Sequence, residues 1–250
     1  MELDLVTGCF TAWDGLELAF RQVGDGRPLI LLHGFTGDSR QWIDHGHAAA
    51  FADRGHRVIV PDLRGHGTSG RPHQAAAYPP DVLADDGLAL VQALGLDDYD
   101  LAGYSLGGRV VLRMLVRGAR PARAVVAGQG LDATSPATDR TDRYRRVLTA
   151  AVEGTALEPE ERVMADWLVR SGGDPQALLL VLDSLVGTPL EALGQITVPT
   201  LVLIGERDTR ASADALAAAI PAARFARVPG DHHAFLRPEL TAAILDFLDG

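Results

Sequence analysis

Short, continuous apolar runs alternate with longer amphipathic stretches along most of the chain. These runs are too short for helices and are typical of strands that are buried on both faces of a parallel sheet. The strands we expect are residues 6–10, 16–23, 28–32, 58–60, 99–102, 124–127, 200–204 and 224–228. The first two are separated by the turn sequence Trp13-Asp14-Gly15, which predicts an antiparallel hairpin at the start of the sheet.

Amphipathic segments with helical spacing lie between these strands. The helices we expect are residues 40–54, 80–94, 106–118, 211–219 and 238–249. Strands and helices that alternate in this way predict an α/β fold. The expected architecture is a doubly wound, mostly parallel eight-stranded sheet with helices on both faces.

A helical stretch interrupts this alternation between the sixth and seventh strands. Its pattern predicts helices at about 138–153, 159–171 and 175–186, which end at glycines 154, 172–173 and 187. The stretch is inserted on the side where open α/β sheets bind their ligands. We therefore interpret residues 131–194 as a small helical lid on a core of residues 1–130 and 195–250, with an ordinary helical excursion as the alternative.

Composition narrows the class of protein. The 250 residues are 47% hydrophobic and 22% charged, which suits a folded domain with a large core. The net charge of −10, with no basic stripe, argues against a nucleic-acid partner. Cys9 is the only cysteine, so an intrachain disulfide is excluded. The first residues lack the features of a signal peptide and no long apolar segment occurs, so we expect a cytoplasmic protein without membrane contact.

The segment around Ser105 is the strongest chemical signal. Ser105 lies between Gly103 and Gly107, where an apolar run ends and a helical pattern begins. This G-x-S-x-G arrangement is typical of a sharp strand-to-helix turn that presents a nucleophilic serine. Glycines are needed there because side chains would collide with the flanking strand and helix. The alternative is an ordinary serine in a turn.

Four further motifs stand at strand ends, in a fixed order around this turn. In chain order, the five are His33-Gly34-Phe35, Asp62-Leu-Arg-Gly-His-Gly-Thr-Ser69, Gly103-Tyr-Ser-Leu-Gly-Gly108, Gly205-Glu-Arg-Asp208 and Asp231-His232-His233. Over essentially its full length, the chain resembles the α/β-hydrolase superfamily. The resemblance implies the α/β-hydrolase fold and a catalytic triad in the order Ser105, Asp208, His232.

The chemistry of these residue types agrees with that reading. A serine hydroxyl becomes a good nucleophile when a neighbouring base removes its proton, and histidine has a suitable pKa. A carboxylate then orients the imidazole and stabilises its charged form. Two alternatives for the acid stay open: Asp208 as the N-cap of the helix that begins near residue 212, and Asp132 as the acid in its place.

Two adjacent histidines compete for the role of base. The superfamily pattern has an apolar residue four positions after its histidine, and Leu236 fulfils this for His232. We therefore assign His232 and place His233 beside the pocket. Asp231 stands where the superfamily commonly has glycine, and the spacing to Pro238 is one residue short, so His233 stays the alternative.

The resemblance also implies an oxyanion hole built from the backbone amides of Phe35 and Leu106. We expect His33 to brace its loop rather than to take part in chemistry, and Asp62 and His66 to be structural members of theirs.

The substrate pocket should receive side chains from the core and the lid. Our candidates are Trp42, Tyr104, Trp167 and Leu168, together with His233. We expect neither a metal nor a cofactor, because the metal-binding, phosphate-loop and dinucleotide motifs are missing from the sequence.

The expected function is a serine hydrolase, a carboxylesterase or lactonase, that cleaves a small-molecule ester through an acyl-enzyme. A cofactor-free perhydrolase or a carbon–carbon bond hydrolase would use the same triad. A ligand-binding protein of this fold with vestigial turnover is the alternative of another class. Substrate identity and oligomeric state are not readable from the sequence.

Overall fold

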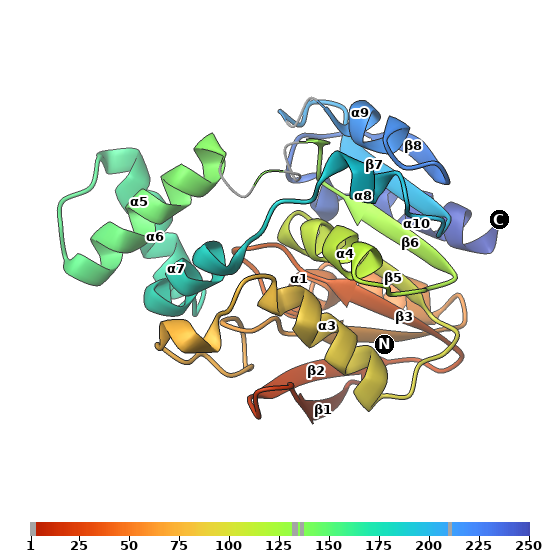
Figure 1. The fold of residues 1–250 in the computed structure, drawn as a ribbon, viewed down its shortest axis with the longest axis horizontal. Helices are drawn as coiled ribbons and strands as arrows, with labels where there is room; N and C mark the ends of the chain where they lie inside the picture. The colour runs from red at the N-terminus through yellow and green to blue at the C-terminus, as the bar shows by residue number, and fades with distance from the viewer. Residues whose placement is uncertain (1–3, 132–134, 136–137, 210–211) are drawn as a thin grey trace.

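One mixed sheet forms the centre of the molecule. The computed structural model describes residues 4–131, 135, 138–209 and 212–250 (Figure 1). The strands are β1 (Val6–Thr11), β2 (Glu17–Val23), β3 (Arg27–Leu32), β4 (His56–Pro61), β5 (Asp100–Tyr104), β6 (Arg123–Ala127), β7 (Thr200–Gly205) and β8 (Ala223–Val228). Their order is β1-β2-β4-β3-β5-β6-β7-β8. The β1–β2 and β2–β4 pairs are antiparallel and the others are parallel, which confirms the expected sheet and its leading hairpin.

Helices cover both faces of the sheet, as expected (Figure 1). The core helices are α1 (Arg40–Ile43), α2 (His47–Ala52), α3 (Val82–Ala93), α4 (Leu106–Val116), α8 (Leu190–Leu193), α9 (Ala213–Ala218) and α10 (Pro238–Asp249), with short 3₁₀ helices η1 (Ala75–Ala77) and η3 (Ala234–Leu236). Side chains along β3 alternate between two hydrophobic layers, as the pleat requires. Ile30 and Leu32 pack in the layer that contains α3, α4 and α9, whereas Leu29 and Leu31 pack in the layer that contains α2 and α10.

The helix expected over residues 40–54 is two short helices, and that prediction was wrong in this detail. Gly46 separates α1 from α2 with φ of +78°, a left-handed conformation that glycine adopts without strain. Within the described residues, no helix is both long enough and apolar enough to cross a lipid bilayer.

Three helices lie between β6 and α8 and project away from the sheet (Figure 1). They are α5 (Asp139–Glu153), α6 (Pro159–Arg170) and α7 (Pro175–Ser184), and we call them the cap. The α5 helix begins with a capping box between Thr138 and Thr141 and ends at Gly154, whose φ is +69°. Cap helices pack on one another through buried side chains such as Val147, Leu148 and Leu178.

The strand order reverses beside β3, which has β4 on one side and β5 on the other. The loop after β3 continues into α1 and α2 on one face, and β5 continues into α4 on the opposite face. Loops that diverge in this way open a crevice at the carboxyl ends of parallel strands. The motifs around His33 and Ser105 therefore meet at this crevice.

A buried ionic cluster holds the hairpin and α3 to the loop after β4. The Arg64 side chain has no exposed surface, and its guanidinium lies 2.8 Å from Asp86 and 2.6 Å from Asp14. It also donates to the Ala77 carbonyl at 2.7 Å. Removing one partner of such a cluster leaves a charge buried without compensation.

We predict that Arg64→Met lowers the free energy of unfolding by about 3–5 kcal/mol, because the Asp86 carboxylate stays buried without its partner. Urea denaturation measures this change. The matched control is Arg54→Met, which removes a surface pair with Asp249 whose side chains are 53% and 46% exposed. This control should cost less than about 1 kcal/mol. Equal effects of the two variants would contradict the prediction.

Candidate active site

Ser105 occupies the sharp turn that the sequence predicts between β5 and α4. Its φ of +57° and ψ of −113° are rarely adopted by residues other than glycine, and such strain is typical of functional sites. A Cβ atom on Gly103 would lie 2.3 Å from the backbone of Gly107, and one on Gly107 would lie 2.2 Å from the Leu32 carbonyl oxygen. Both glycines are therefore required for α4 to pack this closely against the ends of β3 and β5.

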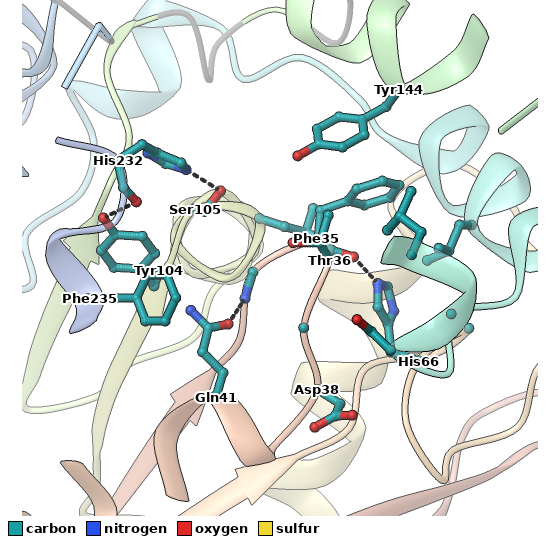
Figure 2. Close-up of a pocket in the computed structure, with 18 of the residues that line it drawn as sticks. Phe35, Thr36, Asp38, Gln41, His66, Tyr104, Ser105, Tyr144, His232 and Phe235 are labelled. Carbon is teal, nitrogen blue, oxygen red and sulfur yellow. Dashed lines mark hydrogen bonds between the residues drawn. The ribbon is translucent and has the colours of Figure 1, made fainter. Parts of the chain in front are cut away.

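Ser105, His232 and Asp208 form one chain of hydrogen bonds. The His232 Nε2 atom lies 3.1 Å from Ser105 Oγ (Figure 2). The His232 Nδ1 atom lies 2.7 Å from Asp208 Oδ2. The Asp208 carboxyl group is fully buried, while the His232 side chain is 23% exposed. When His232 Nδ1–H donates a hydrogen bond to the carboxylate, the Nε2 lone pair faces the serine hydroxyl. This arrangement can transfer a proton from Ser105 to His232.

Two of the three alternatives for the acid and the base can be located in the structure. The N-cap of α9 is Ser212, not Asp208. Asp132 lies outside the described residues. The His233 side chain is 73% exposed and its Nδ1 atom lies 3.2 Å from Asp231, although His233 does line the pocket.

Backbone contacts hold the loops that carry Asp208 and His232 against each other. The Arg207 amide donates to the Gly230 carbonyl at 2.8 Å. A Cβ atom on Gly205 would lie 2.4 Å from the Asp231 carbonyl oxygen, so only glycine permits this approach. On the other side, the Tyr104 hydroxyl donates to the His232 carbonyl at 3.0 Å (Figure 2).

Phe35 and Leu106 line the same pocket as Ser105. Leu106 is the first residue of α4, so its amide has no acceptor within the helix. Within the described part of the chain, neither amide donates to an acceptor. The Gly34 amide, by contrast, donates to Gln41 Oε1 at 2.7 Å. Two unengaged amides beside a nucleophile can bind a negatively charged oxygen.

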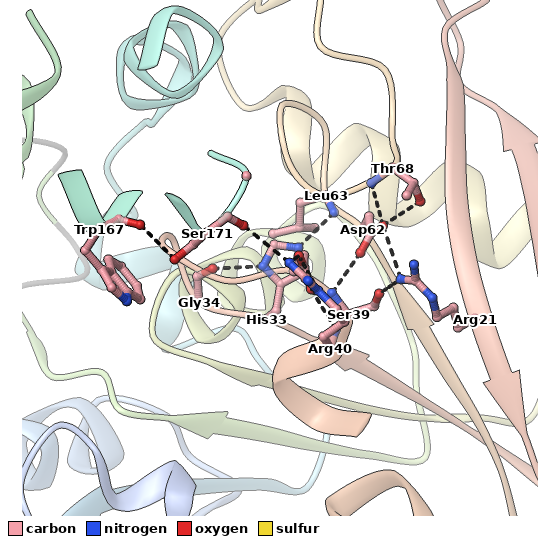
Figure 3. Close-up of polar contacts among 12 residues, drawn as sticks. Arg21, His33, Gly34, Ser39, Arg40, Asp62, Leu63, Thr68, Trp167 and Ser171 are labelled. Atoms are coloured by element: carbon pink, nitrogen blue, oxygen red, sulfur yellow. Dashed lines mark hydrogen bonds and ion pairs between the residues drawn. The ribbon is translucent and has the colours of Figure 1, made fainter. Parts of the chain in front are cut away.

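Buried histidines support the loop that carries Phe35. His33 Nδ1 donates to the Gly34 carbonyl at 2.8 Å, and its Nε2 accepts from the Leu63 amide at 3.0 Å (Figure 3). His66 Nε2 lies 2.9 Å from the Phe35 carbonyl oxygen. Burial lowers the pKa of both rings, that of His66 to about 4. Both are therefore neutral near pH 7 and hold the backbone of this loop.

Asp62 connects the same loop to the one that follows β4. Its carboxylate accepts from the Ser39 amide at 2.7 Å and from the amide and hydroxyl of Thr68, each at 2.8 Å (Figure 3). Burial alone would raise the pKa of this carboxyl, but the hydrogen bonds from Ser39 and Thr68 outweigh it and lower the pKa to about 2.

A cavity of about 660 Å³ opens above Ser105, between the core and the cap. Of the expected pocket residues, Tyr104, Trp167, Leu168 and His233 line it. The prediction for Trp42 was wrong: its side chain is 1% exposed and packs in the hydrophobic layer of α2 and α10. The register of the short helix α1 turns Trp42 toward the sheet and its neighbour Gln41 toward the cavity.

Three polar or aromatic residues of the site were missed in the sequence. Gln129 donates from its side chain to the Ser105 carbonyl, and Gln41 holds the Gly34 amide. Tyr144 of α5 packs on Phe35, with ring centroids 4.9 Å apart. Gln129 follows the end of β6, so the strand-end rule that identified the other motifs could have identified it. The sequence carries no comparable signal for Gln41 or Tyr144.

Metal-ligating side chains are not gathered at this site or elsewhere in the described residues, where no group of three or more histidine, cysteine, aspartate or glutamate residues is placed to hold an ion.

Comparison with known proteins identifies the family. The model of the α/β hydrolase fold family matches residues 27–166, which is more than half of the chain. The chain belongs to the α/β-hydrolase fold family. Both the sheet topology and the position of Ser105 after β5 agree with this membership.

Relatives within the α/β-hydrolase family have several names. A non-heme haloperoxidase of Rhodococcus erythropolis is 38% identical over 120 residues, which are 47% of this chain and 42% of that protein. A 2-hydroxymuconate semialdehyde hydrolase of Pseudomonas sp. (strain CF600) is 30% identical over 128 residues, 51% and 45% of the two chains. The matches thus span less than half the length of these curated relatives. The solved thermophilic esterase from Thermogutta terrifontis has 27% identity and a TM-score of 0.78 over 98% of both chains.

Because the pKa of Asp62 is depressed in the folded state, this carboxylate stabilises the fold above about pH 4 and loses that effect as the pH falls toward 2. We predict that Asp62→Asn costs about 2 kcal/mol at pH 7 and that the difference from the wild type shrinks between pH 4 and pH 2. Urea denaturation at a series of pH values measures both quantities. A difference that does not change with pH would contradict the assignment.

Proposed function

We propose that this protein is a serine hydrolase that cleaves a small carboxylic ester or lactone through an acyl-enzyme intermediate. The observation that carries the proposal is the chain of contacts from Ser105 Oγ to His232 at 3.1 Å and from His232 to Asp208 at 2.7 Å. These are the distances at which a base can take the serine proton while a carboxylate stabilises the resulting imidazolium.

Acylation would proceed in two proton transfers. Ser105 Oγ attacks the substrate carbonyl while His232 Nε2 takes its proton. The amides of Phe35 and Leu106 bind the oxyanion of the tetrahedral intermediate. The carbon–oxygen bond of the ester then breaks, and His232 returns the proton to the departing alcohol. In the second half, water attacks the acyl group with His232 as base, and the acid leaves as Ser105 regains its proton.

The shape of the pocket favours a small substrate with an apolar part. Its walls include Phe35, Met164, Leu168 and Leu182 from the core and the cap. Its volume of about 660 Å³ lies in the range of small-molecule sites. The likeness to the Thermogutta terrifontis esterase, which covers nearly the whole of both chains, supports ester hydrolysis.

A second candidate is perhydrolysis or carbon–carbon bond hydrolysis on the same residues. It is favoured by the 38% identity to a haloperoxidase and the 30% identity to a 2-hydroxymuconate semialdehyde hydrolase. Assays with nitrophenyl esters of increasing acyl length, with lactones and with peroxide-dependent halogenation separate the two. Halogenation without ester or lactone turnover would favour the second candidate.

We predict that a fluorophosphonate probe labels this protein once, at Ser105, and that Ser105→Ala abolishes the labelling. Mass spectrometry of the labelled peptide measures both. Ser171→Ala is the matched control, because Ser171 lines the same pocket but its hydroxyl donates to the Trp167 carbonyl at 2.8 Å. Absence of labelling in the wild type would favour a ligand-binding protein with vestigial turnover.

The two adjacent histidines give a separate test of the base. We predict that His232→Ala lowers kcat by roughly 10³-fold or more, because Ser105 loses its proton acceptor. His233→Ala should change kcat by less than about tenfold, since its side chain faces Asp231 and solvent. Steady-state kinetics on one reactive ester measures both variants, with circular dichroism as the folding control. The opposite ranking would make His233 the base.

A further inference from the structure

Arginines are concentrated at the wall of the cavity. Arg40, Arg109 and Arg140 line it, against the two aspartates Asp38 and Asp44, in a chain with a net charge of −10. Both aspartates act on Arg40, whose pKa they raise, Asp38 most strongly. Arg40 also forms an ion pair with Asp38.

Two of these arginines are engaged in holding the structure together. Arg40 pairs with Asp38 at 2.6 Å. It also donates to the Ser171 carbonyl of the cap at 3.3 Å (Figure 3). Arg109 donates from Nη2 to the carbonyls of Ser135 and Val186, at 2.7 and 3.0 Å, where the chain enters and leaves the cap.

Arg140 differs from both. It lies in the first turn of α5, is half-buried, and makes no hydrogen bond or ion pair in the structure of the described residues. The polar groups next to it are occupied, because Thr138 and Thr141 bond to each other in the capping box. Asp139 and Asp142 are one and two residues away along the helix, so they point to other sides of α5.

Arg140 is connected to the surroundings of Ser105 through Tyr144 and Phe35. Tyr144 follows it by four residues and therefore shares its face of α5. The Tyr144 ring packs on Phe35 with centroids 4.9 Å apart, and the Phe35 amide belongs to the proposed oxyanion hole (Figure 2). The backbone of Arg140 thus lies about one helical turn, ~5.4 Å, along α5 from that of Tyr144.

We propose that Arg140 binds a carboxylate of the substrate, so that the enzyme selects esters or lactones whose acyl part carries a second, ionised carboxyl group. This inference rests on the proposed hydrolase function and names the substrate class. A guanidinium is charged at every working pH, and its planar fork of donors matches the two oxygens of one carboxylate. At a half-buried wall this attraction is screened less than it would be in open water.

The test compares ionised and neutral esters of equal length. The substrates are 4-nitrophenyl hemiesters of succinate, glutarate and adipate, and the 4-nitrophenyl esters of butyrate, pentanoate and hexanoate. We expect the wild type to have a higher kcat/KM for at least one hemiester than for its neutral counterpart. Arg140→Gln should lower kcat/KM for that hemiester by about 10- to 100-fold, mainly through KM, and change the neutral esters by less than twofold. Arg140→Lys should retain part of the preference.

The matched control is Arg143→Gln, on the same helix, because Arg143 is exposed and does not line the cavity. It should leave both series unchanged. A wild type without preference for any hemiester, or an Arg140→Gln variant that affects both series equally, would overturn the proposal.

Binding without turnover separates this proposal from the proposed function. Calorimetry with glutarate on Ser105→Ala, and on Ser105→Ala combined with Arg140→Gln, measures carboxylate binding alone. We expect at least tenfold weaker binding in the double variant. If Arg140→Gln weakens glutarate binding but the probe does not label Ser105 in the wild type, the carboxylate site is supported and the hydrolase function is rejected. Equal binding by the two variants would reject the carboxylate site, whatever the activity.

Discussion

The site depends on one close backbone contact, between the first turn of α4 and the end of β3. The Gly107 amide donates to the His33 carbonyl at 3.0 Å, and no side chain fits at Gly107 beside the Leu32 carbonyl. This contact fixes the start of α4 against the loop after β3. Leu106 and Phe35 belong to those two segments and consequently line the same pocket as Ser105. A strained φ such as that of Ser105 persists only where the surrounding structure fixes it.

Different contacts stabilise the loops of the core and the cap, and the two parts contribute differently to the site. Buried side chains such as His33, Asp62 and Arg64 bond the loops of the core to one another. The return segment of the cap is held by arginines of α4, since Arg109 donates to Val186 and Arg113 donates to Gly187. Rigid core loops can keep reacting groups in register, while the cap contributes most of the apolar wall that a substrate meets.

The sequence predicted the sheet, most helices and the positions of Ser105, Asp208 and His232 because strands buried on both faces and glycine-bounded turns leave local signals. It did not predict which side of a short helix faces the cavity. Trp42 and Gln41 are neighbours on α1, a four-residue helix that ends before the break at Gly46. Tyr144 was missed for a similar reason: its role depends on how α5 packs over Phe35, a contact between segments about a hundred residues apart.

The reacting residues and the residues of the pocket wall carry different information about function. A serine, an imidazole and a carboxylate in contact define a mode of proton transfer, and that mode serves esters, peracids and carbon–carbon bonds alike. The relatives' different names, a haloperoxidase and a 2-hydroxymuconate semialdehyde hydrolase, agree with this. Discrimination among substrates must then come from the differential binding of groups that do not react. Arg140 of α5 is such a group on the cavity wall, because no other described residue engages its guanidinium donors.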